Sequence, residues 1–189
     1  MPYRYINFQY FFFNTYAGYF LQVIPIALLS ACIYLIYKTR KGISFKDSFT
    51  GILFSAYLTG LLSLTLTPMH FWGRFWYWLF YGFNGYPDLQ LFTFQYDLIP
   101  DFFARFSAEN FGNIMMFIPF GILLPLWKKN LGFGKTVLAG FLFSLTIELI
   151  QPIIGRAFDI NDIILNTLAT VSSAGVLFII KRIRKAPVF

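Results

Sequence analysis

Polar side chains that could do chemistry stand close together in one stretch of an otherwise apolar chain, IELIQPIIGRAFDINDIILNT at residues 147–167. Its carboxylates and amides include Glu148, Gln151, Asp159, Asp162 and Asn166. The first two are three residues apart and the last three follow i, i+3, i+7 spacing, which places each group on one helix face. Carboxylates could act as general bases or bind a cationic group, and amides could orient a ligand by hydrogen bonds.

Two further polar residues extend this group. Arg156 lies between the two sets, where a guanidinium could fork across a carboxylate or bind an anionic headgroup. Asn113 lies in an earlier apolar segment, two turns after Ser107, at the same expected depth. The candidate catalytic residues are Glu148, Asp159 and Asp162, and the candidate substrate-binding residues are Asn113, Gln151, Arg156 and Asn166.

Structural roles compete with these assignments. A carboxylate on the lipid face near mid-span costs at least ~2.5 kcal/mol, so these groups should turn inward and share partners. Asp159 could simply cap a helix, and Asp162 would be favoured by the positive helix end. The amides could join helices. Three carboxylates with amide oxygens could also hold Mg²⁺ or Ca²⁺, but no spacing dictates a metal, so metal and cofactor stay unassigned.

The surrounding segments define the class of protein. Of 189 residues, 58% are apolar, 22% aromatic and only 12% charged, which lies outside the soluble range. Five segments reach or approach the ~20 apolar residues needed to cross ~30 Å of hydrocarbon. We expect an all-α, polytopic membrane helix bundle with spans at about Tyr19–Tyr37, Phe49–Thr67, Ala108–Trp127, Thr136–Ile154 and Ile160–Ile180.

The sequence also predicts where the last three spans begin or end. Ser107 is a predicted cap for span three, Pro152 is expected to end span four, and Gly155 allows a tight turn into span five. The short connection predicts that spans four and five are antiparallel neighbours.

The basic residues predict an orientation. The net charge is +7, and eleven of the fifteen positive residues fall after span one, between spans three and four, and after span five. Because basic loops tend to be cytoplasmic, the N-terminus is expected outside and the C-terminus inside. Such clusters attract anionic lipid headgroups, so they indicate no nucleic-acid partner.

An intensely aromatic segment, HFWGRFWYWLFYGFNGY at residues 70–86, follows span two. It is short and carries Arg74 near its middle, and a sixth crossing would move the basic residues 128–135 outside. We expect an interfacial or re-entrant segment that serves as a surface anchor or as a lid over an outward-facing site. No boundary divides the chain, so a single transmembrane domain over residues 1–189 is predicted.

Three blocks in order resemble the VanZ-like membrane proteins, a family named for the accessory protein of teicoplanin-resistance clusters. The blocks are NIMMFIPFG (113–121), IELIQ (147–151) and GRAFDINDIILNT (155–167), within a VanZ-like core of about residues 107–180. The recurring polar positions of that family match the seven candidate residues above. Pro119 is expected to kink span three while neighbours satisfy the freed carbonyl. Many relatives carry glycine where this chain has Ala169 and Thr170, which puts close helix packing there in question.

The resemblance implies a multi-pass bacterial plasma-membrane protein tied to reduced susceptibility to teicoplanin. An outward-facing polar site formed by the last three spans would bind or act on an outer-leaflet amphiphile, such as a lipid-linked cell-wall precursor, a membrane lipid headgroup or the lipoglycopeptide itself. Two alternatives stay open. The polar cluster could be a structural lock in a non-enzymatic assembly factor, or the protein could be a small transporter, although inverted repeats are not visible.

Overall fold

The computed structural model describes residues 8–68, 70–82 and 91–185 of the chain. Residues 83–86 of the predicted aromatic segment therefore lie outside the described part. Seven α-helices fall within it. The long ones are α2 (Tyr16–Arg40), α3 (Phe45–Thr65), α5 (Ala108–Trp127), α6 (Phe133–Ile150) and α7 (Ile160–Lys185), and the short ones are α1 (Phe8–Asn14) and α4 (Phe71–Tyr81).

The five long helices confirm the five predicted spans. In the described residues, these five are long and apolar enough to cross a membrane. Large apolar side chains remain exposed along them, for example Leu29 and Ile33 on α2 and Val176 and Ile179 on α7, each more than half exposed. A water-soluble protein would bury such residues, whereas hydrocarbon solvates them. The chain is therefore a membrane protein.

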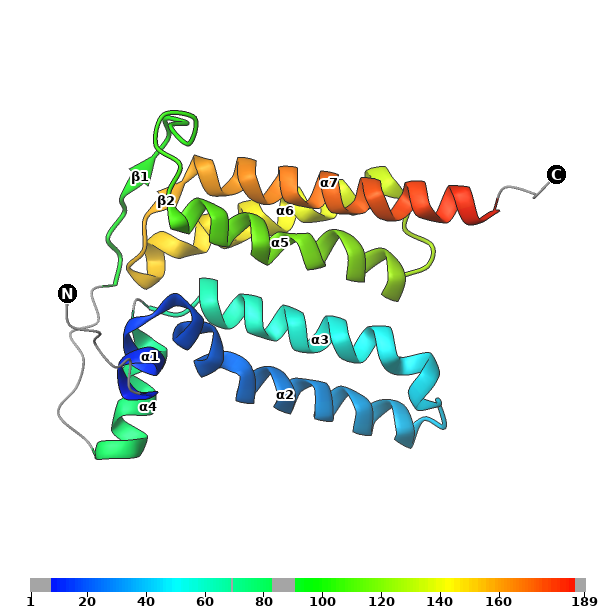
Figure 1. Ribbon diagram of the computed structural model, residues 1–189, viewed down its shortest axis with the longest axis horizontal. Helices are drawn as coiled ribbons and strands as arrows, with labels where there is room; N and C mark the ends of the chain where they lie inside the picture. Colours follow the sequence, from blue (N-terminus) through cyan, green and yellow to red (C-terminus); the bar gives the residue numbers. More distant parts are fainter. Residues whose placement is uncertain (1–7, 69, 83–90, 186–189) are drawn as a thin grey trace, which may run out of the picture.

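The long helices pack in two groups. The helices α2 and α3 lie side by side as a pair, and α5, α6 and α7 form a second group in which α7 packs on both of the others (Figure 1). A buried apolar cluster joins the groups, with Phe54 and Leu61 from α3 against Phe117 and Phe120 from α5. The three helices that carry the candidate residues thus form one unit.

Helix caps form where the sequence predicts them. The Ser107 hydroxyl accepts the Asn110 backbone N–H at 3.1 Å and begins α5. The helix α6 ends at Ile150 and continues as a 3₁₀ turn, Gln151–Ile154, which contains Pro152. Gly155 then takes a left-handed conformation (φ 80°) that other residues rarely adopt, and the chain reverses into α7.

The aromatic segment forms the helix α4, which is no sixth span. With 11 residues it is ~16 Å long, about half of a bilayer core. Figure 1 shows it at the end of the α2–α3 pair, running across the direction of these two helices. Two indole N–H groups attach it: Trp72 donates to the Ser63 carbonyl at 2.7 Å, and Trp76 to the Gln22 carbonyl at 2.8 Å.

The expected all-α architecture has one small departure. The two-residue strand β1 (Tyr96–Asp97) pairs in parallel with β2 (Phe158–Asp159), so that Asp97 lies opposite Asp159. The same loop supplies the N–H groups of Phe92 and Thr93 to the carbonyls of Ile153 and Pro152, both at 3.1 Å. The end of a helix leaves carbonyls without partners, and here the loop satisfies them.

The helix α7 packs closely against its neighbours at Ala169 and Thr170, where many relatives carry glycine. Ala169 and Thr170 are 4% and 0% exposed. The space comes from the opposite helices, because a Cβ at Gly121 of α5 would lie 2.2 Å from the Ser173 hydroxyl, and one at Gly140 of α6 would lie 2.7 Å from Thr170. The glycines that permit close approach are therefore on the partner helices.

Candidate functional site

The Glu148 side chain links the end of α6 to the start of α7 by a hydrogen bond. It lies in the last turn of α6 and is 1% exposed. Its Oε2 atom accepts the backbone N–H of Asp159 at 2.9 Å. The Gln151 amide, turned so that its nitrogen faces these oxygens, donates at 3.0 Å both to Glu148 and to the Ala157 carbonyl. We prefer this orientation because it gives two good bonds in place of one of 3.5 Å to the Thr65 carbonyl.

Asp162 and Asn113 join α7 to α5. The Nδ2 atom of Asn113 donates to Oδ1 of Asp162 at 2.5 Å. Asn113 is 7% exposed, whereas Asp162 is only partly buried. The Oδ2 atom of Asp162 has no hydrogen-bond partner in the described part of the chain. Asp162 can therefore keep its helix contact and still accept a hydrogen bond from a ligand.

Asp159 lies outside the spans, directly before α7. Its Oδ1 atom accepts the Asn161 backbone N–H at 2.7 Å, which confirms its predicted cap role. Burial raises the pKa of its carboxyl above the ordinary value, and the charges of Asp97 and Asp101 act in the same direction. Asp159 is thus a carboxyl group that releases its proton less readily than an exposed aspartate.

Arg156 contacts a helix of the other group. Its Nη1 atom donates to the carbonyl of Leu64, in the last turn of α3, at 3.0 Å. The side chain is partly exposed and lies close enough to Glu148 and Asp162 for charge interactions through space. Within the described residues it forms no ion pair with a carboxylate, so of the two possible roles the fork across Glu148 or Asp162 is absent and headgroup binding stays a prediction. The guanidinium keeps donors for another acceptor.

Asn166 lies one turn deeper than Asp162 on α7. Its Nδ2 atom donates to the hydroxyl of Ser144 on α6 at 2.9 Å, and it is 4% exposed. Its Oδ1 atom is buried without a partner among the described residues. An unsatisfied buried acceptor is costly, so this oxygen is suited to a bound water or a ligand donor.

Two contributors escaped the sequence analysis. The buried Asn161 donates to the Asp101 carboxylate at 2.9 Å, and its Oδ1 atom accepts the Asp101 N–H at 3.0 Å. The sequence shows Asn161 between Asp159 and Asp162 at the start of α7, which could have indicated a polar role. Its partner Asp101 could not be predicted, because it lies in the loop before α5. Ser144 gave no signal, because one serine in an apolar helix is ordinary.

The seven predicted residues thus lie at one end of α5, α6 and α7. The hydrogen-bonded groups are Glu148 with Gln151 and the Asp159 backbone, Asn113 with Asp162, and Asn166 with Ser144, while Arg156 bonds to the Leu64 carbonyl. Within the described residues, no group of three or more His, Cys, Asp or Glu side chains could hold a metal ion.

These features define a class, the helical membrane proteins with a polar site at one end of an apolar bundle. The VanZ/LLP1 family model matches residues 24–181, so the chain belongs to that family. It is similar to Protein VanZ of Enterococcus faecium, with 36% identity over 94 residues, which cover 42% of this chain and 58% of that protein. No solved structure matches the chain.

Proposed function

We propose that this protein is a multi-pass protein of the bacterial plasma membrane that binds an amphiphile of the outer leaflet and lowers susceptibility to teicoplanin. The N-terminus would be outside and the C-terminus inside, with a single transmembrane domain over residues 1–189. The amphiphile would be a lipid-linked cell-wall precursor, a membrane lipid or the lipoglycopeptide. Similarity to a protein named VanZ supports the link to glycopeptide resistance.

The orientation is supported by the separation of charge along the bundle. The connection between α2 and α3, the connection between α5 and α6, and the C-terminal end of α7 lie together at one end of the molecule (Figure 1). These are the basic regions, which the positive-inside tendency assigns to the cytoplasm. The candidate site and the helix α4 lie at the opposite end. A site there would open outward.

One observation carries the proposal: Asp162 and Arg156 lie at the same end of the bundle and both keep unused hydrogen-bonding capacity. Oδ2 of Asp162 is an acceptor, and the remaining N–H groups of Arg156 are donors. A headgroup that contains an anion and a hydroxyl or amine would satisfy both. Asn166 Oδ1 offers a further acceptor at greater depth.

The remaining residues position these groups. Glu148 and Gln151 are buried before the turn that carries Arg156, and their side chains bond to the backbone of Asp159 and Ala157 after it. Asn113 fixes the side chain of Asp162. Asp159, whose pKa is raised by burial, is a carboxyl group that can exchange a proton with a bound headgroup.

The test is teicoplanin susceptibility of cells that express Asp162→Asn or Arg156→Gln. We expect both variants to lose most of the protection while membrane abundance and melting temperature stay close to those of the wild type. Asn can keep the bond to Asn113, so Asp162→Asn removes charge with little change in shape. The matched control is Glu109→Gln, which removes an exposed carboxylate at the start of α5. Full protection by both site variants would refute the proposal.

A structural lock is the second candidate, and the complete satisfaction of Glu148 favours it. If the cluster only holds α5, α6 and α7 together, every variant that lowers resistance will also lower abundance or melting temperature. If the cluster is a ligand site, loss of resistance and loss of stability should separate. Substitution of Glu148 should lower stability, whereas substitution of Asp162 should lower resistance alone.

A further inference from the structure

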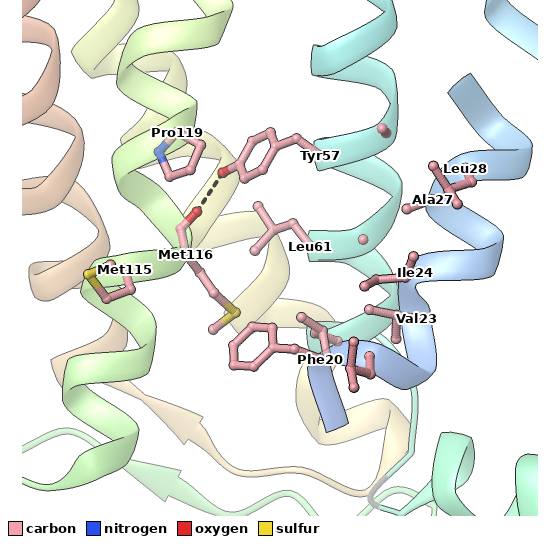
Figure 2. A pocket seen from close by; sticks show the side chains of 14 residues that line it. Phe20, Val23, Ile24, Ala27, Leu28, Tyr57, Leu61, Met115, Met116 and Pro119 are labelled. Atoms are coloured by element: carbon pink, nitrogen blue, oxygen red, sulfur yellow. Dashed lines mark hydrogen bonds between the residues drawn. The ribbon is translucent and has the colours of Figure 1, made fainter. Parts of the chain in front are cut away.

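An apolar groove lies between α2, α3 and α5. Its volume is about 480 Å³, and it is open to the surroundings. Figure 2 shows side chains from the three helices that line it. The groove lies within helices that are long and apolar enough to cross a membrane, so its surroundings are hydrocarbon. An occupant must therefore be an apolar chain or an apolar helix face.

The walls of the groove suit a flexible chain. Ala27, Ala56 and Gly60 leave space on the α2 and α3 side, and Met115 and Met116 cover the α5 side. Methionine side chains are unbranched and adapt to irregular apolar partners. They can follow an acyl chain better than a rigid surface can.

The lining side chains of the groove offer no free polar group in the described part of the chain. The one hydroxyl on its wall, that of Tyr57, donates to the carbonyl of Met116 at 2.8 Å, as Figure 2 shows. Proline has no N–H, so Pro119 leaves the carbonyl of Met115 without its usual helix bond. Tyr57 bonds to the next carbonyl, that of Met116, and not to that of Met115. The groove therefore provides apolar contact alone.

The groove adjoins the polar site at Leu64. The side chain of Leu64 lines the groove, and its carbonyl accepts Nη1 of Arg156 at 3.0 Å. A second link runs along α5, where Met116 lies one turn after Asn113, the partner of Asp162. The partly exposed guanidinium has donors left for an anion at this end of the groove.

We infer that the groove holds an acyl chain of an anionic phospholipid, whose phosphate is bound by Arg156. This inference rests on the proposed function and names the class of amphiphile that the site takes. A second copy of the chain would also cover an apolar groove, but it would leave the donors of Arg156 without an anion. A phospholipid satisfies both parts at once.

The experiment uses the full chain in nanodiscs that contain phosphatidylglycerol or phosphatidylcholine with a photoreactive diazirine in one acyl chain. Cross-linked peptides are mapped by mass spectrometry. We expect phosphatidylglycerol to label the α5 segment around Met115 and Met116 in preference to the other lipid-facing segments. Arg156→Gln should reduce this labelling by about tenfold, the scale of one lost charge-assisted hydrogen bond. It should leave the weaker phosphatidylcholine labelling unchanged.

A filling variant tests the groove itself. A Cβ at Gly60 would meet only the Cβ of Ala27, at 3.8 Å, so the larger side chain of Gly60→Leu can enter the groove without a backbone clash. We expect several-fold weaker labelling of the α5 segment. Gly134→Leu on α6 is the matched control, because a Cβ there meets nothing within 4 Å.

Three results would overturn the inference: equal labelling by both lipids, unchanged labelling in Gly60→Leu, or cross-links between two copies of the groove. The proposed function is tested by a different measurement, teicoplanin susceptibility, so its failure can be distinguished from failure of the lipid assignment. If Asp162→Asn loses protection while acyl labelling is unselective, the site stands and the lipid assignment falls. If labelling is selective while Asp162→Asn keeps full protection, the lipid assignment stands and the proposed role of the site in resistance falls.

Discussion

At the scale of single residues, the polar cluster is explained by the cost of burying charge in an apolar bundle. Glu148 is 1% exposed, yet its carboxylate accepts a backbone N–H and the Gln151 amide. Buried polar groups are tolerated when they are hydrogen-bonded. Asp162, Arg156 and Asn166 are members that keep capacity for a partner outside the cluster.

Glu148 should be the most sensitive residue for stability. Glu148→Leu removes the acceptor of the Asp159 N–H, and a buried donor without a partner costs about 1–3 kcal/mol. We expect a clear drop in melting temperature, measured by scanning fluorimetry of the purified protein. Glu109→Leu, which removes an exposed carboxylate, should change it little. Equal effects of the two substitutions would mean that Glu148 does not hold the turn.

Asp159 gives a pH dependence whose sign follows from its raised pKa. Because the folded-state pKa lies above the ordinary value of 3.8, the folded protein binds this proton more tightly than the unfolded chain. The resulting stabilisation is fully present below the unfolded pKa and is lost as pH rises through the folded pKa.

Asp159→Asn removes this titration while it keeps the acceptor for Asn161. The melting temperature of the wild type, relative to Asp159→Asn, should therefore fall as the pH rises from below 3.8 through the raised folded-state pKa. A constant difference over that range would contradict the assignment.

The residue scale also shows the limit of sequence reasoning. Depth and spacing sufficed to gather the seven candidates at one end, because a helix fixes both along its axis. They could not predict that Arg156 bonds to Leu64, since that contact depends on where α3 ends relative to the turn before α7. Asn161 and Asp101 were missed as a pair for the same reason.

At the scale of elements, the site depends on how closely α7 approaches α5. Gly121 faces Ser173 and the Thr170 carbonyl, and a Cβ there would lie 2.2 and 2.7 Å from them. The five spans follow from hydropathy, so their approximate ranges were predictable. The helix α1 and the pairing of β1 with β2 were not, because they arise from long-range contacts and from backbone groups that need partners.

Gly121→Ala should force α5 and α7 apart. The expected loss of stability is on the order of 1–3 kcal/mol, as for other overpacked sites. Thermal unfolding measures it, and Gly112→Ala on the same helix is the control, because a Cβ there meets nothing within 4 Å. If Gly121→Ala is as stable as the wild type, the close approach of these helices does not support the site.

At the scale of the whole molecule, the two ends of the bundle differ in kind. One end carries the basic connections, and the other carries the polar cluster, the β1–β2 pairing and the aromatic helix α4 (Figure 1). This asymmetry underlies the proposed orientation, with the site outside.

Cysteine labelling tests the orientation in intact cells. Cys32 is first replaced by alanine, and single cysteines are placed at Ile99, in the loop beside the site, or at Asn130, between α5 and α6. Both positions are exposed. A membrane-impermeant maleimide should label Ile99→Cys in intact cells and Asn130→Cys only after permeabilisation. The reverse pattern would invert the topology and place the site inside.

The central claim is that the polar cluster at the ends of α5, α6 and α7 binds an amphiphile. The most direct measurement is a cryo-EM structure of the full chain in native-like bilayer, at a resolution that shows bound lipids. We predict headgroup density within hydrogen-bond distance of both Arg156 and Oδ2 of Asp162. Well-ordered density for these side chains, with their polar atoms satisfied entirely by the protein and no headgroup between them, would contradict the claim.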